Sequence, residues 1–229
     1  MSDRLWWRIG AACGILYVVL EITGLGFGIA NSFAGVDLDS SKGEIARAFA
    51  NPASTGAWVG IYLEVLSILF FVVFAARLWA TLRRAEGDPG WISLAAFGSA
   101  LTFATMTLFA FALGGTTAYW AGHGLNAQIS LALGQVGFAA YVLTWAVGAL
   151  FLGGTAAVVL RTGALSRWLG WSAAVIAVAS LAAVAAPISG PAQLPAFLFL
   201  LWIVAASIVL MRHEEEQAPV LTGALSPSS

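Results

Sequence analysis

Two glutamates, Glu21 and Glu64, lie inside long apolar stretches and are the residues of this chain best suited to chemistry. A carboxylate in the hydrocarbon of a membrane costs about a few kcal/mol or more, so such a residue is rare and usually functional. At a helical rise of about 1.5 Å per residue, Glu21 lies about 21 Å beyond Trp7 and Glu64 about 10 Å beyond Ala57. If the two helices are antiparallel neighbours spanning a hydrocarbon core about 30 Å thick, both carboxyls are predicted at one level in its outer half.

Two carboxyls that close together in a low dielectric cannot both stay ionised, so the pair is expected to share a proton and titrate as a unit. Three functions fit. Glu21 and Glu64 can be structural, joining helices by hydrogen bonds. They can line an outward-facing binding or transport site for a small molecule or ion, with protonation linked to binding. Alternatively, they are the catalytic acid and base of an intramembrane enzyme, such as a cyclase or isomerase, acting on a lipid or isoprenoid. We take the binding site as the functional hypothesis, and whether the protein is an enzyme stays open.

Further polar residues are expected near the two carboxyls. Helical spacing places Tyr17 on the same face as Glu21, and Ser67 on the same face as Glu64. Gly56 and Gly60 precede Glu64 at the spacing typical of closely packed membrane helices. Later apolar stretches bring other hydroxyl groups to a similar depth, and a histidine in the following outer loop is placed to gate the site. The predicted ligand-binding residues are therefore Tyr17, Ser67, Thr102, Thr105, His123, Tyr141 and Thr144.

No metal or cofactor is predicted. Glu21, Glu64 and His123 come from separate segments and carry no metal-ligand spacing. The chain has one cysteine, Cys13, and two histidines, and it lacks the glycine-rich and catalytic motifs of nucleotide-binding and hydrolytic enzymes.

The elements that position these residues follow from composition and run length. The chain of 229 residues is 60% hydrophobic and 9% charged, with a net charge of -1, which excludes a typical soluble domain and gives no reason to expect nucleic acid as a partner. About 20 apolar residues cross a bilayer, and six stretches reach that length. They are Trp6–Ile29, Pro52–Leu82, Trp91–Ala118, Ile129–Leu160, Trp168–Pro187 and Ala192–Met211. We predict an all-α, polytopic membrane protein with one six-helix transmembrane domain over residues 1–212.

The distribution of basic residues predicts the orientation. Segments on one side hold eight arginines, whereas the other side holds only Lys42 and Arg47, and basic residues favour the cytoplasmic side. The eight are Arg4, Arg8, Arg77, Arg83, Arg84, Arg161, Arg167 and Arg212. Both termini are therefore predicted to be cytoplasmic, in a multi-pass protein of the cell membrane.

Two segments outside the membrane are predicted. In the outer loop 31–51, Ser41 and Glu44 have the spacing of a capping box, and Ile45, Ala48 and Phe49 recur at helical spacing. A short amphipathic helix lying on the membrane is expected there. Residues 213–229, which are acidic and then rich in Pro, Thr and Ser, are expected to form a disordered cytoplasmic tail.

Several stretches of the chain carry a family resemblance. The stretch 161–171, RTGALSRWLGW, follows the glycine-rich 151–154, and 76–84, ARLWATLRR, precedes the turn 86–91. In these motifs the chain resembles uncharacterised six-helix integral membrane proteins common in actinobacteria. The resemblance implies the six-helix fold and carries no established activity. Membrane lipids and a small apolar or cationic ligand are the expected partners, and the oligomeric state stays open between a monomer and a homo-oligomer.

Overall fold

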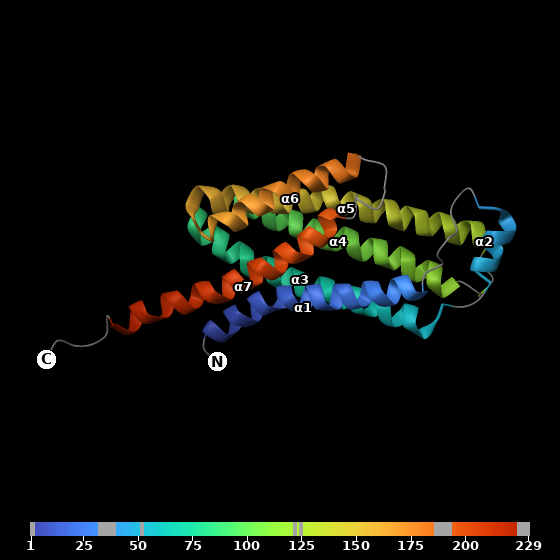
Figure 1. Cartoon of the computed structure of the whole chain (residues 1–229), viewed down its shortest axis with the longest axis horizontal. Coiled ribbons are helices and arrows are strands. Elements are labelled where there is room, and N and C mark those ends of the chain that lie inside the picture. The colour runs from blue at the N-terminus through green and yellow to red at the C-terminus, as the bar shows by residue number, and fades with distance from the viewer. Residues whose placement is uncertain are drawn as a thin grey trace.

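Every regular element of the computed structural model is a helix, within residues 3–31, 40–50, 53–120, 123, 126–185 and 194–223, which the structure describes (Figure 1). The helices are α1 (Asp3–Asn31), α2 (Lys42–Ala48), α3 (Thr55–Glu86), α4 (Trp91–Trp120), α5 (Ala127–Thr162), α6 (Arg167–Ala185) and α7 (Leu194–Gly223). All except α2 are long and apolar enough to cross a membrane. The prediction of an all-α, six-span membrane protein is confirmed.

The six long helices close into a ring. Along the chain α1 packs on α3, α3 on α4, α4 on α5, α5 on α6 and α6 on α7, and α7 returns to pack on α1. The described chain starts and finishes at the same end of this bundle, with α2 at the opposite end (Figure 1). An even number of spans requires that arrangement. That the shared end is cytoplasmic stays a prediction from the arginines.

The outer surface of the ring is apolar. Large side chains such as Val178 and Leu201 are 68% and 66% exposed, which hydrocarbon tolerates because lipid tails are as apolar as the side chains. Trp91, Trp168 and Trp171 are also exposed. They belong to the helix ends of the arginine-rich side, where an aromatic belt at the membrane interface is expected.

Phe71 of α3 is the centre of the core. Its ring is fully buried and lies within 6.2 Å, centroid to centroid, of four rings from four other helices. These are Tyr17 of α1, Phe103 of α4, Phe151 of α5 and Phe199 of α7. Tilted and edge-on aromatic pairs contribute about 0.5–1.5 kcal/mol beyond the area that they bury. This cluster joins five of the six spans at one level.

The turn between α3 and α4 is held by side chains from the end of α3. Glu86 accepts hydrogen bonds from the backbone N–H groups of Ile92 and Ser93, at 3.1 and 2.7 Å, and so satisfies the free donors at the start of α4. Arg83 pairs with Asp88 at 2.7 Å. Gly90 has a positive φ of 62°, which glycine adopts without steric cost.

The short helix of the 31–51 loop forms as predicted, but it packs on protein. Ser41 accepts from the backbone N–H of Glu44, and the Glu44 carboxylate accepts from the backbone N–H of Ser41, so the capping box is present. Ile45 and Phe49 are buried in a small cluster with Leu131 of α5. The apolar face of α2 therefore covers the start of α5, and the place of this helix at the membrane surface stays a prediction.

The segment after Arg212 also differs from the expectation. Helix α7 continues to Gly223, whereas we predicted disorder from residue 213 onward. Glutamate and glutamine favour helix, and extending an existing helix avoids the cost of nucleation. Residues 224–229 lie outside the described residues.

Candidate functional site

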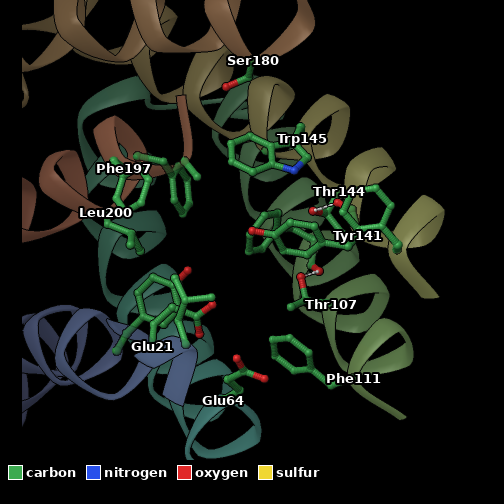
Figure 2. A pocket seen from close by; sticks show the side chains of 17 residues that line it. Glu21, Glu64, Thr107, Phe111, Tyr141, Thr144, Trp145, Ser180, Phe197 and Leu200 are labelled. Carbon is green, nitrogen blue, oxygen red and sulfur yellow. Dashed lines mark hydrogen bonds between the residues drawn. The ribbon is translucent and has the colours of Figure 1, made fainter. Parts of the chain in front are cut away.

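All six long helices contribute to a cavity of about 460 Å³ inside the ring, which Figure 2 shows from close by. Its lining consists of Tyr17, Glu21, Leu25, Glu64, Phe103, Thr107, Phe111, Phe138, Tyr141, Thr144, Trp145, Gly148, Ser180, Ala196, Phe197, Phe199 and Leu200. Most of these side chains are apolar or aromatic, and none of them is basic. Three rings of the central aromatic cluster, those of Tyr17, Phe103 and Phe199, form part of the wall.

Both intramembrane glutamates line this cavity. Glu21 comes from α1 and Glu64 from α3, each is half-buried, and Figure 2 shows the two carboxyl groups on the same side of the cavity. Phe197 and Leu200 of α7 face Tyr141 of α5 across the open space (Figure 2). The carboxyls therefore have access to a space that an apolar molecule can fill.

Ser67 connects the two glutamates. Its Oγ lies 2.6 Å from Glu21 Oε2 and 2.7 Å from the main-chain carbonyl oxygen of Glu64. One hydroxyl carries one proton, so Ser67 can donate to only one of these acceptors at a time. A neutral Glu21 that donates to Ser67, with Ser67 donating to the Glu64 carbonyl, satisfies both contacts. An ionised Glu21 satisfies only one.

The threonine and serine hydroxyls in the wall can act as acceptors toward the cavity. Thr107 donates to the carbonyl of Phe103 at 2.8 Å and Ser180 to that of Ile176 at 2.8 Å, and Thr144 donates to the carbonyl of Tyr141. Each proton is thus used within its own helix, while the oxygen lone pairs remain. Carboxyl oxygens, hydroxyl lone pairs and the faces of aromatic rings are all electron-rich. The phenolic O–H groups of Tyr17 and Tyr141 add hydrogen-bond donors to this wall.

The predicted site residues divide into two groups. Tyr17, Tyr141 and Thr144 line the cavity with the two glutamates, and Ser67 contacts Glu21 from just behind the wall. Thr102 and Thr105 do not reach it. Both are exposed and donate to the carbonyls of Gly98 and Leu101 in their own helix.

Thr107, rather than the predicted Thr105, is the lining threonine of α4 for a reason that follows from helical geometry. Two residues along a helix turn the side chain by about 200°, so Thr107 faces inward where Thr105 faces outward. The depth of each threonine in the membrane could be estimated from the sequence, but the sequence did not show which threonine lies on the side of the helix that faces the bundle. The rings of Phe103 and Phe111 stand four residues before and after Thr107, and this spacing is the signal that identifies the inner face.

His123 lies apart from the cavity. Its ring is exposed and stacks on Tyr119, with ring centroids 5.4 Å apart. The structure does not bring it to the two glutamates, so its predicted part in ligand binding is not supported by its position. Within the described residues no three His, Cys, Asp or Glu side chains gather in a way that could hold a metal ion.

The aromatic part of the wall was missed. Phe111, Phe138, Trp145 and Phe197 were not among the predicted binding residues, because any one aromatic side chain in a membrane helix has many explanations. In α5 the spacing of Tyr141, Trp145 and Gly148 places all three on one face of the helix, and this signal could have identified the face that lines the cavity.

No family model, curated protein or solved structure matches the chain. The resemblance to six-helix proteins of actinobacteria therefore stays an expectation. Any assignment of function depends on the cavity and its residues.

Proposed function

We propose that this membrane protein binds a small lipophilic cation in the cavity between its helices, with protonation of Glu21 and Glu64 linked to binding. The observation that carries the proposal is that both carboxyl-bearing side chains line one cavity whose remaining wall is apolar or aromatic, with hydroxyl groups from threonine, serine and tyrosine and no basic side chain. Its volume of about 460 Å³ falls in the range typical of small-molecule sites, about 300–1,000 Å³.

The chemistry of the wall favours a cation over an anion or a neutral polar molecule. An organic cation gains from a carboxylate counter-charge and from aromatic faces, each ring contributing about 0.5–2 kcal/mol when water is excluded. The rings of Tyr141 and Trp145 and the carboxyl of Glu64 line the same space. An anion would meet carboxyl oxygens with no basic side chain in the described wall to balance them.

The two glutamates are expected to differ in role. The contacts of Ser67 suit a neutral Glu21, which leaves Glu64 to carry the negative charge that meets the ligand. The other titratable groups that line the cavity are Tyr17 of α1 and Tyr141 of α5, and the lining residues from α4, α6 and α7 include none. A cation and a proton then compete for the same carboxylate, so binding releases a proton or is weakened by one.

The continuity of the six long helices favours a binding protein over a transporter. Secondary transporters commonly place their sites at broken helices, whereas the six long helices here are each continuous through the described residues. We therefore assign binding as the primary activity. Movement of the ligand across the membrane is a separate question for vesicle assays.

A fixed-charge probe tests the proposal. Tetrapropylammonium binding to the full chain in lipid nanodiscs should weaken by about tenfold to a hundredfold in Glu64→Gln, which removes the negative counter-charge of the ligand. Glu44→Gln is the matched control, because glutamine also serves in a capping box and residue 44 lies in α2 away from the cavity. Equal affinities of both variants and the native chain would refute the proposal.

The contacts of Ser67 also favour a second candidate, acid–base catalysis on an isoprenoid. A neutral Glu21 would give its proton to one alkene carbon, which leaves a carbocation at the other alkene carbon. An ionised Glu64 would then take a proton from the allylic carbon next to that cation, so the double bond shifts by one position, no atoms are gained, and the two carboxyls exchange protonation states. Aromatic faces would stabilise the intermediate cation. Mass spectrometry in deuterated water distinguishes this reaction, since the product would gain deuterium.

A further inference from the structure

The wall of the cavity is exposed at three positions only. Among its lining residues Leu25, Phe138 and Phe197 are 39%, 42% and 53% exposed, whereas the others are buried or half-buried. These three come from α1, α5 and α7, one from each. We call them the mouth residues.

The exposed mouth residues mark the opening of the cavity. In the ring α6 stands between α5 and α7, and α5 meets α7 through Phe151, whose ring centroid lies 6.3 Å from that of Phe199 and 6.1 Å from that of Trp202. Two other helix pairs of the ring approach each other closely. A Cβ on Gly137 of α5 would stand 3.2 Å from Leu113 Cβ of α4, and one on Gly24 of α1 would stand 3.1 Å from the Gly60 carbonyl oxygen of α3. The arginine-rich side is blocked by the aromatic cluster around the fully buried Phe71.

The mouth lies within or at the edge of the hydrocarbon. Measured along the helices from the arginines near their ends, Leu25 lies about 26 Å from Arg8 and Phe197 about 22 Å from Arg212. A hydrocarbon core is about 30 Å thick. The mouth residues are all apolar, so lipid tails can lie directly against them. Glu21 and Glu64 line the same cavity (Figure 2).

We propose that the ligand is a single-chain cationic amphiphile that enters from the membrane leaflet farther from the arginine-rich end, through the opening marked by the mouth residues. Its charged head lies at Glu21 and Glu64, and its apolar tail lies across Leu25, Phe138 and Phe197 and extends into the bilayer. This inference rests on the proposed function and adds the class of ligand and its route.

A photoreactive amphiphile tests where the tail lies. Decyltrimethylammonium with a diazirine near the end of its tail is irradiated with the full chain in nanodiscs, with and without excess tetrapropylammonium. Labelling that the competitor removes should fall on the peptides that carry the mouth residues and should decrease in Glu64→Gln. Labelling of lipid-facing Leu150 and Val178 should be unaffected by the competitor.

The outcomes separate this inference from the proposed function. Competed labelling at Trp58 or Tyr119, which contact each other near the α2 end of the bundle, would show access from water and overturn the lateral route. Tetrapropylammonium binding without any competed labelling at the mouth would also overturn it, while the proposed function would stand. Absence of tetrapropylammonium binding would refute both the proposed function and the lateral route.

A pair of variants gives an independent measurement. Phe138→Arg places a positive charge at the mouth and should slow association of the amphiphile by about tenfold or more. Val136→Arg adds the same charge to the same helix at an exposed residue that does not line the cavity, and it should have little effect. Equal association rates of the two variants would contradict the route, and thermal unfolding of each variant shows whether it is folded.

Discussion

Gly24 of α1 lies so close to Glu64 of α3 that a Cβ on the glycine would stand 2.8 Å from Glu64 Cγ and 3.1 Å from its backbone nitrogen. Real Cβ atoms essentially never approach other atoms to within 3.0 Å. The absence of a side chain at residue 24 therefore lets the two helices meet at the level of Glu64. Glu64 itself lines the cavity (Figure 2).

Replacement of this glycine should separate the helices or displace the carboxyl. We expect Gly24→Ala to lower the free energy of unfolding by about 1–3 kcal/mol, the usual cost of overpacking. Gly26→Ala is the control, since a Cβ there meets nothing within 4 Å. It should be neutral or stabilising by up to about 1 kcal/mol, because alanine favours helix. Denaturant unfolding in detergent measures both, and equal destabilisation would show that the contact is unimportant.

The two glutamates should be energetically coupled. Replacing either one by leucine leaves the other carboxyl beside an apolar side chain, and Glu21→Leu also removes the partner of Ser67. In a double-mutant cycle with Glu21→Leu and Glu64→Leu, we expect a coupling energy of about 0.5–3 kcal/mol, with the double variant less destabilised than the sum. Glu21→Leu combined with Glu44→Gln should be additive. Additive effects of Glu21 and Glu64 would mean that the two side chains do not interact.

Neighbouring threonines of α4 should respond differently to the same change. Thr107 is 2% exposed and lines the cavity, whereas Thr105 is exposed and does not. Phenylalanine at residue 107 should fill part of the cavity and weaken tetrapropylammonium binding by about tenfold or more. Thr105→Phe should leave binding unchanged. If Thr107→Phe unfolds, Thr107→Val removes the hydroxyl with little change of volume and should weaken binding by a smaller factor.

Trp7 should matter more for stability than its neighbour Trp6. The guanidinium carbons of Arg77 and Arg84 lie 4.2 and 4.1 Å from the centre of the Trp7 ring, so both cations stack on one indole. Each contact is expected to contribute about 0.5–2 kcal/mol. Trp7→Leu should therefore lower the free energy of unfolding by about 1–3 kcal/mol. Trp6, which is 60% exposed, should tolerate leucine, and a result with the opposite order would refute the stacking interpretation.

The architecture was predictable because each span is encoded locally. Runs such as Trp91–Ala118 exceed the thickness of a bilayer, and the observed helix extends only two residues beyond the predicted end. The capping box of Ser41 and Glu44 was readable for the same reason, since its residues are three positions apart. What α2 packs against depends on the distant Leu131, which no local pattern indicates.

The site was predictable in part. Hydropathy identifies a charge in an apolar run, so Glu21 and Glu64 stand out at once, and helical spacing adds Tyr17 and Ser67. Whether a residue faces the interior depends on the rotation of each helix in the bundle. That rotation separates Thr107 from Thr105, and it arises from contacts between helices such as that of Gly148 in α5 with Phe103 in α4.

The central claim, that a carboxylate in the cavity is the counter-charge of a cationic ligand, is tested most directly by the pH dependence of binding. The affinity of the native chain for tetrapropylammonium, whose charge does not titrate, should rise as pH increases, because the cation competes with a proton for Glu64. In Glu64→Gln, which keeps the size and hydrogen bonding of the side chain but cannot ionise, the affinity should be lower and should not change with pH. A native affinity that does not change with pH, or a pH dependence that survives in Glu64→Gln, would contradict the account.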